Sequence, residues 1–527
     1  MSVSTDDTVA VIGAGMAGLA AAVRLAAAGY RVVVLEAQAE AGGKMRRVEV
    51  GGQTFDAGPT VLTMKWVFDA LFTAGGRVIE EELTLVPSSV IARHYWRGGD
   101  ALDLYADPTE NVRAIADFAG LRNAEGYRRF AADSRRTYEV LKDSFIDAAR
   151  PNPVSLSRRI GFGRPGDLLA IKPFATLWSA LGGYFPDRRL RQLFARYATY
   201  CGSSPYQSPA TLMLVAHVEQ EGVWTVKGGI RALAQRLADL AGALGVEFRY
   251  GEAVTEIILD PSRRGVGGVV TRSGRRVDAR HVIYNGDVAA LPRLLGVAPS
   301  DPARLQTQRS LSALVSCRLA APSGVPLAHH TVFFSDDYES EFEAIFRRRS
   351  APSDPTVYLC AQDRAADGCL PTGHTGPERI YSLMNLPADG DRRRFEESEV
   401  SACLKSMEHR LAVNGLMLAP SGVPMDVTTP DRFASLYPGT GGALYGMASH
   451  GWMASFARPG SLGPVPGLYL AGGSVHPGPG LPMAALSGKL AAERLMADRP
   501  LTRRSRPAAI TGGISTERAA AGVSPSR

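Results

Sequence analysis

Cysteine is scarce in this chain of 527 residues, and the few that occur are far apart. No two of them have the C-x-x-C spacing of a redox pair or a zinc site, and an odd number cannot all pair. We therefore expect reduced thiols that act as small core residues, no bound metal and no disulfide reductase chemistry. The five are Cys201, Cys317, Cys360, Cys369 and Cys403.

Long apolar runs are missing as well. No uninterrupted run reaches the ~18 residues of a transmembrane helix. The opening "MSVSTDD" is too brief and too acidic for a signal peptide. We expect neither feature, so that any contact with a membrane is peripheral, on the cytoplasmic side of a bacterial membrane.

Lysine is also scarce, and arginine supplies most of the net charge of +7. The arginines are scattered and form no basic cluster interleaved with aromatic residues, so we expect no nucleic acid partner. Two interpretations of the charge stay open, which are a solvated basic surface and a weak attraction to anionic membranes.

Glycine, in contrast, is placed where a dinucleotide needs it. "VAVIGAGMAGLAAAVRLAAAGYRVVVLE", residues 9–36, predicts a strand, a glycine-rich turn, a helix and a second strand. Gly13 permits the tight turn, Gly15 lets the backbone approach a pyrophosphate, and Gly18 lets the helix pack on the strand. Glu36 would accept hydrogen bonds from the ribose hydroxyls and repel a 2′-phosphate. The pattern predicts FAD or NAD and disfavours NADP.

Two further segments favour FAD, which is longer than NAD and needs additional chain to surround its ribityl group and flavin ring. "AGGKMRR" and "DAGPTV" follow soon after the βαβ unit. Gly42 and Gly43 allow close approach of the backbone, while Lys44 or Arg46 either faces a phosphate or is a surface charge. No second convincing GxGxxG exists, so we expect no separate nicotinamide domain.

The far end of the chain offers another wall. "YLAGGSVHPGPGLPMAALSGKLAAERL", residues 469–495, predicts a strand, a loop and a helix. The backbone N–H groups near Pro482–Ala484 would stabilise negative charge on a reduced flavin. We expect this segment to complete the site that residues 9–36 begin.

Nucleotide-type α/β pieces thus occur at the start, the middle and the end of the chain. We predict an α/β fold in which a discontinuous Rossmann-like FAD-binding domain carries an inserted α+β substrate domain that faces a membrane. Its aromatic helices form core, wall an apolar pocket or touch a bilayer. The predicted FAD-binding domain comprises residues 1–85, 222–292 and 455–500, the substrate domain 86–221 and 293–454, and a disordered tail 501–527.

At this point the residues resemble a known family. The βαβ unit, "FDAGPTVLT", "KGGIRALAQRLA" and "GGSVHPGPGLPMAALSG" are similar to the FAD-dependent amine oxidase superfamily, and within it to bacterial carotenoid desaturases of the phytoene desaturase type. "YNGDVAAL" and "PLAHHTVFF" look most like the hydroxyneurosporene desaturase subgroup. That resemblance implies an FAD-dependent oxidoreductase that forms the 3,4 double bond of a 1-hydroxy- or 1-methoxycarotenoid. The alternatives are a phytoene desaturase with several successive desaturations, an amine oxidase-like flavoenzyme, or a non-catalytic FAD- or carotenoid-binding protein.

The resemblance also implies roles for single residues. The backbone of Val254 would meet the adenine, Gly58, Pro59 and Thr60 would lie near the isoalloxazine, and Gly473 and Met483 would lie on its other edge. The full set of expected cofactor-binding residues is Gly13, Ala14, Gly15, Ala17, Gly18, Glu36, Gly43, Lys44, Met45, Gly58, Pro59, Thr60, Val254, Gly473, Pro482 and Met483.

We predict hydride transfer to the flavin with proton loss from the neighbouring carbon, and oxygen or a quinone as the electron acceptor. Little acid–base machinery is needed, so no catalytic residue is assigned and the main contribution of the protein is orientation in an apolar tunnel. A substrate hydroxyl would need a polar partner at the tunnel end, for which His329, His330, an arginine or a tyrosine are candidates. We expect the His329–His330 pair to be structural or solvent-facing in a loop, and His476 to position backbone.

Overall fold

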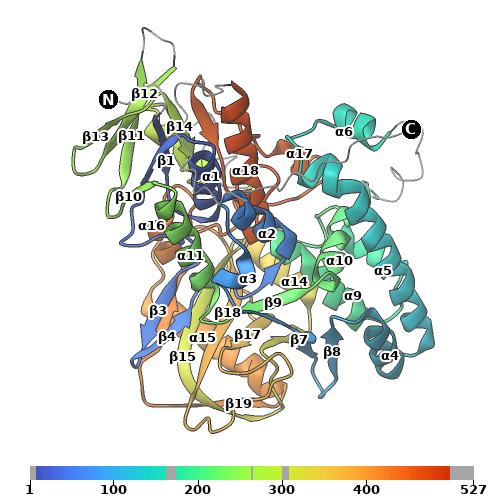
Figure 1. Cartoon of the computed structure of the whole chain (residues 1–527). Helices are drawn as coiled ribbons and strands as arrows, with labels where there is room; N and C mark the ends of the chain where they lie inside the picture. The colour runs from blue at the N-terminus through green and yellow to red at the C-terminus, as the bar shows by residue number, and fades with distance from the viewer. Residues whose placement is uncertain are drawn as a thin grey trace, which may run out of the picture.

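The computed structural model describes residues 8–161, 172, 174–260, 262, 265–298 and 308–498. The predicted disordered tail, residues 501–527, lies outside these ranges. Figure 1 shows an α/β part that carries α1 and α18, a second sheet below it in the view, and a layer of helices to the right.

The first sheet is built from strands that lie far apart in the sequence. Its neighbouring strands are all parallel, in the order β10, β2, β1, β14, β21. Continuous apolar strands of this kind are typical of parallel sheets that are buried on both faces. The strands are β1 (Thr8–Ile12), β2 (Arg31–Leu35), β10 (Glu247–Arg249), β14 (His281–Tyr284) and β21 (Leu468–Leu470).

Alternate residues of β1 face two different layers, as the twofold period of a strand requires. Val9 and Val11 pack with the helices α1 (Met16–Ala27), α2 (Lys65–Ala74), α11 (Ile230–Ala243) and α18 (Leu481–Asp498). Ala10 and Ile12 pack with a small antiparallel sheet on the opposite face. That sheet consists of β11 (Val254–Asp260), β12 (Gly265–Thr271) and β13 (Arg276–Asp278).

The second sheet has the order β19, β15, β18, β17, β16, β7, β8, with β20 paired to β15. Helix α15 (Glu397–Val413) covers one face through Cys403, Met407 and Leu411. Strands β7 and β8 extend this sheet, because β7 pairs in parallel with β16 and β8 pairs with β7. The strands are β7 (Val90–Tyr95), β8 (Ala101–Tyr105), β15 (Ser312–Gly324), β16 (His330–Phe333), β17 (Val357–Ala361), β18 (Glu378–Leu386), β19 (Leu416–Pro420) and β20 (Asp426–Thr428).

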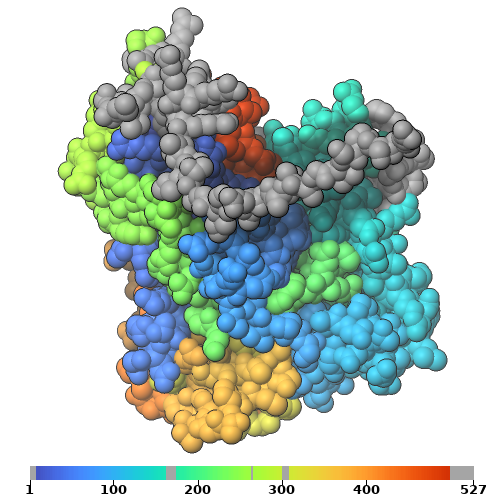
Figure 2. Space-filling view, in the orientation of Figure 1, coloured from blue at the N-terminus to red at the C-terminus, as the bar shows by residue number. Residues whose placement is uncertain are grey.

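Short strands connect the two sheets. The hairpin β3 (Arg47–Val50)–β4 (Gln53–Asp56) packs on β15 and β18 through Val50 and Phe55. A three-stranded sheet joins β5 (Leu62–Thr63), β9 (Val223–Val226) and β6 (Leu85–Pro87). Figure 2 shows this join on the surface, where blue N-terminal segments lie beside green segments that start near residue 220.

The remaining helices surround the space between the sheets. The aromatic helices contribute core through residues such as Phe185 and Phe194, and part of the same region lines a cavity described below. The helices are α3 (Ile79–Glu82), α4 (Pro108–Ala119), α5 (Leu121–Leu141), η2 (Lys142–Ile146), α6 (Pro153–Ile160), α8 (Leu177–Leu181), α9 (Arg188–Ala195), η3 (Arg196–Cys201), η4 (Ala210–Met213), α10 (Leu214–Gln220), η5 (Val288–Ala290), α12 (Leu291–Leu294), α14 (Tyr338–Glu343), η6 (Ala344–Arg348), α16 (Pro430–Leu436) and α17 (Ala454–Ala457).

Candidate functional site

The first glycine turn lies between β1 and α1. Gly13 adopts a φ of +96°, which favours glycine, and its N–H donates to the carbonyl of Leu35 at 2.8 Å. A Cβ on Gly18 would lie 2.1 Å from the carbonyl oxygen of Gly13, so only glycine lets α1 pack this closely. Gly15 precedes the helix, and among the described residues no side chain caps its first N–H groups. These groups are therefore available to a ligand.

Glu36 ends β2 beside this turn and is buried. Its carboxylate accepts hydrogen bonds from the N–H of Ala14 at 2.6 Å and of Gln38 at 2.9 Å. Two carboxylate oxygens offer about four acceptor positions, so capacity for ligand hydroxyls remains. The N–H of Glu252 donates to the carbonyl of Glu36 at 2.9 Å, which brings the segment that leads into Val254 to the same place.

The second glycine turn packs directly on the first. The N–H of Gly42 donates to the carbonyl of Ala14 at 2.8 Å, and a Cβ on Gly43 would lie 3.0 Å from the Cα of Gly15. Met45 is buried below this turn and donates to the carbonyl of Gly42 at 3.0 Å. The side chain of Arg231, on α11, donates to the carbonyl of Ala41 and fixes the turn from the far side.

Asn285 joins three of these segments, and our sequence reasoning missed it. Its side-chain amide nitrogen donates to the carbonyl of Gly13 at 3.1 Å, and its backbone N–H donates to Ile12 at 3.0 Å. A Cβ on Gly472 would lie 3.3 Å from the amide oxygen of Asn285. The available signal was its position, since it follows the apolar strand β14 at the carboxyl edge of the parallel sheet, where ligands bind.

The C-terminal helix α18 lies directly against α1. A Cβ on Gly488 would meet the carbonyl of Ala17 at 2.2 Å, so the helices are in close contact. The loop before α18 is held by Ser487, whose hydroxyl accepts from the N–H of Gly472 at 3.1 Å, and by Arg458, which donates to the carbonyl of Gly473 at 3.2 Å. The two glycine-rich helix starts therefore belong to one region.

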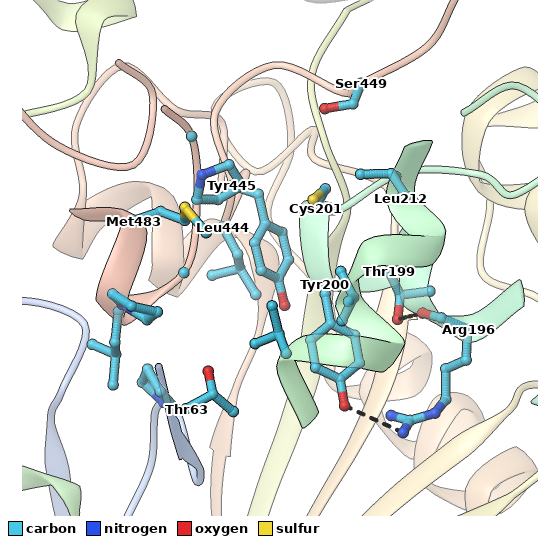
Figure 3. Close-up of a pocket in the computed structure, with 18 of the residues that line it drawn as sticks. Thr63, Arg196, Thr199, Tyr200, Cys201, Leu212, Leu444, Tyr445, Ser449 and Met483 are labelled. Atoms are coloured by element: carbon cyan, nitrogen blue, oxygen red, sulfur yellow. Dashed lines mark hydrogen bonds between the residues drawn. The ribbon is translucent and has the colours of Figure 1, made fainter. Parts of the chain in front are cut away.

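A cavity of about 770 Å³ begins at this region and extends between the two sheets. Predicted cofactor residues that line it are Lys44, Gly58, Pro59, Thr60, Pro482 and Met483. Apolar walls come from side chains such as Val332, Leu212 and Leu444, and Figure 3 shows Met483, Leu444 and Leu212 around this space. Size and lining are those of a site for a large apolar ligand.

Lys44 and Arg46, which we expected at a phosphate or at the surface, both line this cavity. The ammonium of Lys44 donates to the carbonyl of Leu444 and lies 5.4 Å from the ring centre of Tyr437. Arg46 donates to the hydroxyl of Thr428 at 2.5 Å. Burial lowers the pKa of Lys44. The surface interpretation is wrong for Lys44, and a phosphate role for either residue stays a prediction.

The solvent-facing interpretation of the His329–His330 pair is wrong, because His330 is buried and His329 is partly buried, while the structural interpretation stays a prediction. His330 opens β16, is buried and lines the cavity. Its Nδ1 lies 2.8 Å from the hydroxyl of Tyr358, which in turn lies 2.7 Å from the hydroxyl of Thr60. Burial, and after it the charges of His329 and Arg196, hold the pKa of His330 well below its ordinary range. His329 is engaged with the carbonyl of Arg364 at 2.6 Å.

His476 holds a distant helical segment to the C-terminal loop. Its Nε2 lies 2.9 Å from the carbonyls of Phe145 and Ala148. Burial lowers its pKa to about 4, so the ring is neutral at physiological pH and shares one N–H between the two carbonyls. These contacts suit the positioning role that we expected.

One trio of metal-ligating type occurs in the described part of the chain, formed by His329, His330 and Cys360, whose candidate ligand atoms lie within 4.8 Å of one another. Burial raises the pKa of Cys360, so its thiol stays protonated, and Arg196 places a positive charge near His330. Both effects oppose binding of a cation. The expected absence of a metal remains a prediction.

An ionisable side chain, that of Glu341, reaches the inner part of the cavity at a second place. Glu341, on α14, is buried and lines the cavity, and its Oε2 accepts from Ser335 at 2.9 Å and Thr356 at 2.7 Å. Its Oε1 is buried without a partner among the residues that the structure describes. Burial raises the pKa of Glu341 to about 7.

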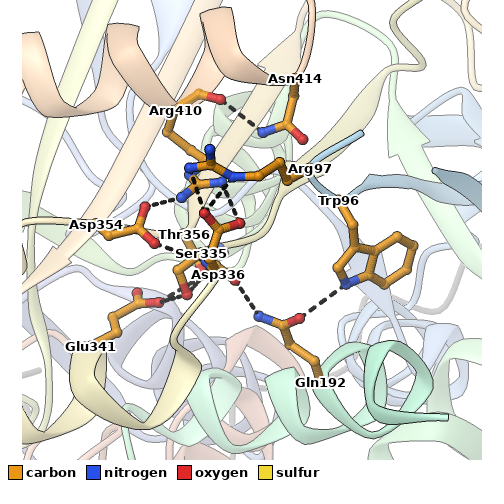
Figure 4. Close-up of polar contacts among 10 residues, drawn as sticks. All are labelled: Trp96, Arg97, Gln192, Ser335, Asp336, Glu341, Asp354, Thr356, Arg410 and Asn414. Carbon is orange, nitrogen blue, oxygen red and sulfur yellow. Dashed lines mark hydrogen bonds and ion pairs between the residues drawn. The ribbon is translucent and has the colours of Figure 1, made fainter. Parts of the chain in front are cut away.

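The network behind Glu341 joins three layers of the molecule (Figure 4). Arg410 of α15 binds Asp336 at 3.1 Å and also Asp354. The carbonyl of Ser335 accepts from Gln192 of α9 at 2.8 Å, and Gln192 accepts from Trp96 at 3.0 Å. The inner wall of the cavity is thereby fixed to both the sheet and the helical layer.

The geometry fits FAD. An uncapped helix start, glycines that no side chain could replace, and a buried acid with free acceptor positions lie together, as an adenosine diphosphate group requires. The adjoining cavity, reached past Gly58–Thr60 and Met483, gives room for a ring system beyond it. Backbone groups, more than charged side chains, form this cofactor site.

Sequence similarity to known proteins supports a flavin site. The model of flavin containing amine oxidoreductases matches residues 16–496. A hydroxyneurosporene desaturase of Rubrivivax gelatinosus is 48% identical over 98% of this chain and 98% of its own length. Another, of Cereibacter sphaeroides, is 44% identical over 94% of this chain and 99% of its own. A 1-hydroxycarotenoid 3,4-desaturase of a Flavobacterium is 33% identical over 92% and 98% respectively.

Solved structures show the same fold at low identity. An oxidoreductase from Methanosarcina mazei aligns with a TM-score of 0.57 at 17% identity, over 92% of this chain and 100% of that one. Putrescine oxidase bound to putrescine gives a TM-score of 0.56 at 14% identity, over 93% and 99%. The predicted fold class is confirmed by these neighbours and by the parallel sheet.

Proposed function

Since the chain belongs to the family of flavin containing amine oxidoreductases, we propose that it is an FAD-dependent desaturase that introduces the C3–C4 double bond into a 1-hydroxy- or 1-methoxycarotenoid. One observation carries this proposal, which is the 48% identity to a hydroxyneurosporene desaturase over nearly the whole of both chains. The phytoene desaturase alternative rests on more distant relatives, such as that of Fusarium fujikuroi at 29% identity.

FAD supplies a two-electron acceptor when it is bound. In our proposal the turn at Gly13 and Gly15 and the start of α1 hold its pyrophosphate, Glu36 holds the ribose of its adenosine, and the backbone near Val254 lies at the adenine. Gly58, Thr60 and the first turn of α18 hold the isoalloxazine. Those residues lie together around one connected region of the described structure.

The chain's own contribution to the reaction is placement. The apolar walls exclude water from the polyene and align its end with the flavin site. The hydrogens that leave lie beside a conjugated system, and the extended conjugation of the product favours their loss. Because this conjugation lowers the need for a strong base, orientation rather than proton transfer dominates in our proposal.

We further propose that the cavity opens toward a membrane surface. Phe174 and Trp452 line it and contact each other with ring centres 5.6 Å apart, yet they are 81% and 48% exposed. With Met453, 42% exposed, they form what we call the apolar rim. Exposed Arg158 and Arg159 lie on α6, which also borders the cavity, and suit anionic headgroups.

No helix in the described ranges combines the length and the apolar character that crossing a bilayer demands. Contact through the rim would therefore be peripheral, on the cytoplasmic side of the membrane in our proposal. A lipid-soluble substrate could then enter from the bilayer without passing through water. The electron acceptor is proposed to be oxygen or a quinone.

The test is turnover of a carotenoid panel. Purified protein is incubated with FAD and liposomes that contain 1-hydroxyneurosporene, neurosporene or phytoene, and products are separated by chromatography with absorbance detection. We expect a product with one more conjugated double bond from 1-hydroxyneurosporene. Turnover of phytoene alone would favour the multistep desaturase, and turnover of an amine alone would overturn the carotenoid assignment.

A further inference from the structure

The inner end of the cavity carries a polar cluster that the desaturation itself does not require. Arg196, Tyr200 and Glu219 all line the cavity, and Tyr197 supports them from behind. Figure 3 shows the Tyr200 hydroxyl directed at the Arg196 guanidinium. A buried charge in an apolar enclosure is costly unless an opposite charge or a hydrogen-bond partner compensates it. The hydrogen bonds of Arg196 therefore decide whether it can bind a ligand.

The hydrogen bonds inside the cluster use the hydroxyl protons of both tyrosines and leave N–H donors of Arg196 free. Glu219 accepts from the hydroxyl of Tyr197 at 2.8 Å and from that of Tyr200 at 2.6 Å. A tyrosine hydroxyl has a single proton, so neither tyrosine has another to donate. The Tyr200 oxygen in turn accepts from Nη2 of Arg196 at 3.3 Å. Within this cluster, donors toward the cavity can therefore come only from Arg196.

Arg196 makes few hydrogen bonds with the protein, although its guanidinium carbon also lies 5.3 Å from the ring centre of Tyr200. Of its five N–H groups, the single side-chain hydrogen bond in the described structure is the long one to Tyr200. Its Nε is buried without a partner among the described residues. No carboxylate oxygen of the described part of the chain lies within 4.0 Å of it. Glu219, beyond the Tyr200 hydroxyl, still supplies negative charge to the cluster, so the missing partner is better a neutral acceptor than an anion.

The position of the cluster suits one end of the proposed substrate. In a 1-hydroxycarotenoid, only C2 separates the oxygen-bearing C1 from the reacting C3–C4 bond, so the oxygen must bind close to the flavin. Thr60, expected at the isoalloxazine, contacts Tyr358 at 2.7 Å. Tyr358 and Arg196 both line the cavity, so they border the same space.

Of the other candidates, the histidines fit less well. His329 does not line the cavity and is bound to the carbonyl of Arg364. His330 lines it, but its Nδ1 is engaged with Tyr358, so it has one ring nitrogen left where a guanidinium has several N–H groups. Arg196 has more unused N–H donors than either histidine.

We propose that Arg196, held in place by Tyr200 and Glu219, binds the C1 oxygen of the carotenoid end group and thereby selects oxygenated over hydrocarbon substrates. This inference rests on the proposed function and adds the residue that determines its specificity. Because the protein provides the donor, a hydroxyl and a methoxyl oxygen both serve as acceptors, whereas a hydrocarbon end leaves Arg196 unpaired in a dry site.

The experiment compares the FAD-loaded wild type with Arg196→Met, which keeps an unbranched side chain without donors, and with Arg196→Lys, which keeps a donor. Arg188→Met, on the exposed start of α9, is the matched control. The ratio of kcat/KM for 1-hydroxyneurosporene to that for neurosporene is measured in liposomes. We expect Arg196→Met to lower this ratio about 10- to 100-fold, Arg196→Lys to restore part of it, and Arg188→Met to leave it unchanged.

An unchanged ratio in Arg196→Met, or an equal fall for both substrates, would overturn the inference and leave Arg196 a structural residue. A second measurement needs no variant. The wild type should turn over 1-methoxyneurosporene comparably to the hydroxyl compound and neurosporene far more slowly. Rejection of the methoxyl compound as strongly as the hydrocarbon would refute a protein-side donor. If the wild type turned over none of these carotenoids, the proposed function itself would fail.

Discussion

Replacing Glu341 by glutamine should abolish a pH dependence of stability that the wild type carries. Burial raises the pKa of Glu341 to about 7 from an ordinary 4.5. In the pH range between these values the folded state binds a proton that the unfolded state has released, so stability falls as pH rises. The difference corresponds to ~3 kcal/mol, lost between about pH 4.5 and pH 8. Glutamine carries no titrating proton and has no such loss.

The assay follows the free energy of unfolding of wild type and Glu341→Gln in urea from pH 5 to pH 8, with circular dichroism and flavin fluorescence as probes. The difference between the two proteins should move by ~3 kcal/mol in favour of the variant across this range, whatever the constant effect on packing. Glu339→Gln, an exposed neighbour on α14, is the control and should track the wild type. Infrared difference spectra should show a protonated carboxyl in the wild type that disappears near pH 7. A difference between the proteins that stays constant with pH would refute the reasoning.

Two further predictions concern the cofactor and the membrane. Glu36→Ala should weaken FAD binding roughly 10- to 100-fold, because it removes the acceptor for the ribose and leaves the N–H of Ala14 unpaired. Titration of apoprotein with FAD measures this affinity, with Glu49→Ala as the control that should bind FAD normally. Full flavin occupancy in Glu36→Ala would exclude the ribose role. The double variant Phe174→Ser/Trp452→Ser should reduce sedimentation with anionic liposomes roughly tenfold or more. The control Leu121→Ser should not, although Leu121 is as exposed as Phe174, at 81%. Equal losses in both proteins would argue against the apolar rim.

The parts of the site that sequence could predict are those with local causes. The spacing of Gly13, Gly15 and Gly18 and the acid Glu36 express contacts within one βαβ unit, so the turn could be assigned without a structure. The C-terminal loop and helix were expected to complete this site from their own strand, loop and helix pattern, and the structure packs α18 against α1.

The remaining parts depend on contacts between distant segments. Asn285 reaches Gly13 across 272 positions and Arg231 reaches Ala41 across 190, and neither has a local pattern that announces the contact. Strand β7 pairs with β16, which lies more than 200 residues later, and no local pattern indicates that pairing. The His329–His330 pair could not be oriented until β16 was known to be a buried strand. Arg196 became distinctive only when the hydrogen bonds of its tyrosine and glutamate neighbours could be counted.

The most direct test of the account is anaerobic mixing of the FAD-loaded protein in liposomes with 1-hydroxyneurosporene, while flavin absorbance and the carotenoid spectrum are recorded together. The account predicts that the flavin bleaches as the carotenoid spectrum shifts to longer wavelength, with one carotenoid desaturated for each flavin reduced. A flavin that stays oxidised with this carotenoid but bleaches with phytoene or with an amine would contradict it.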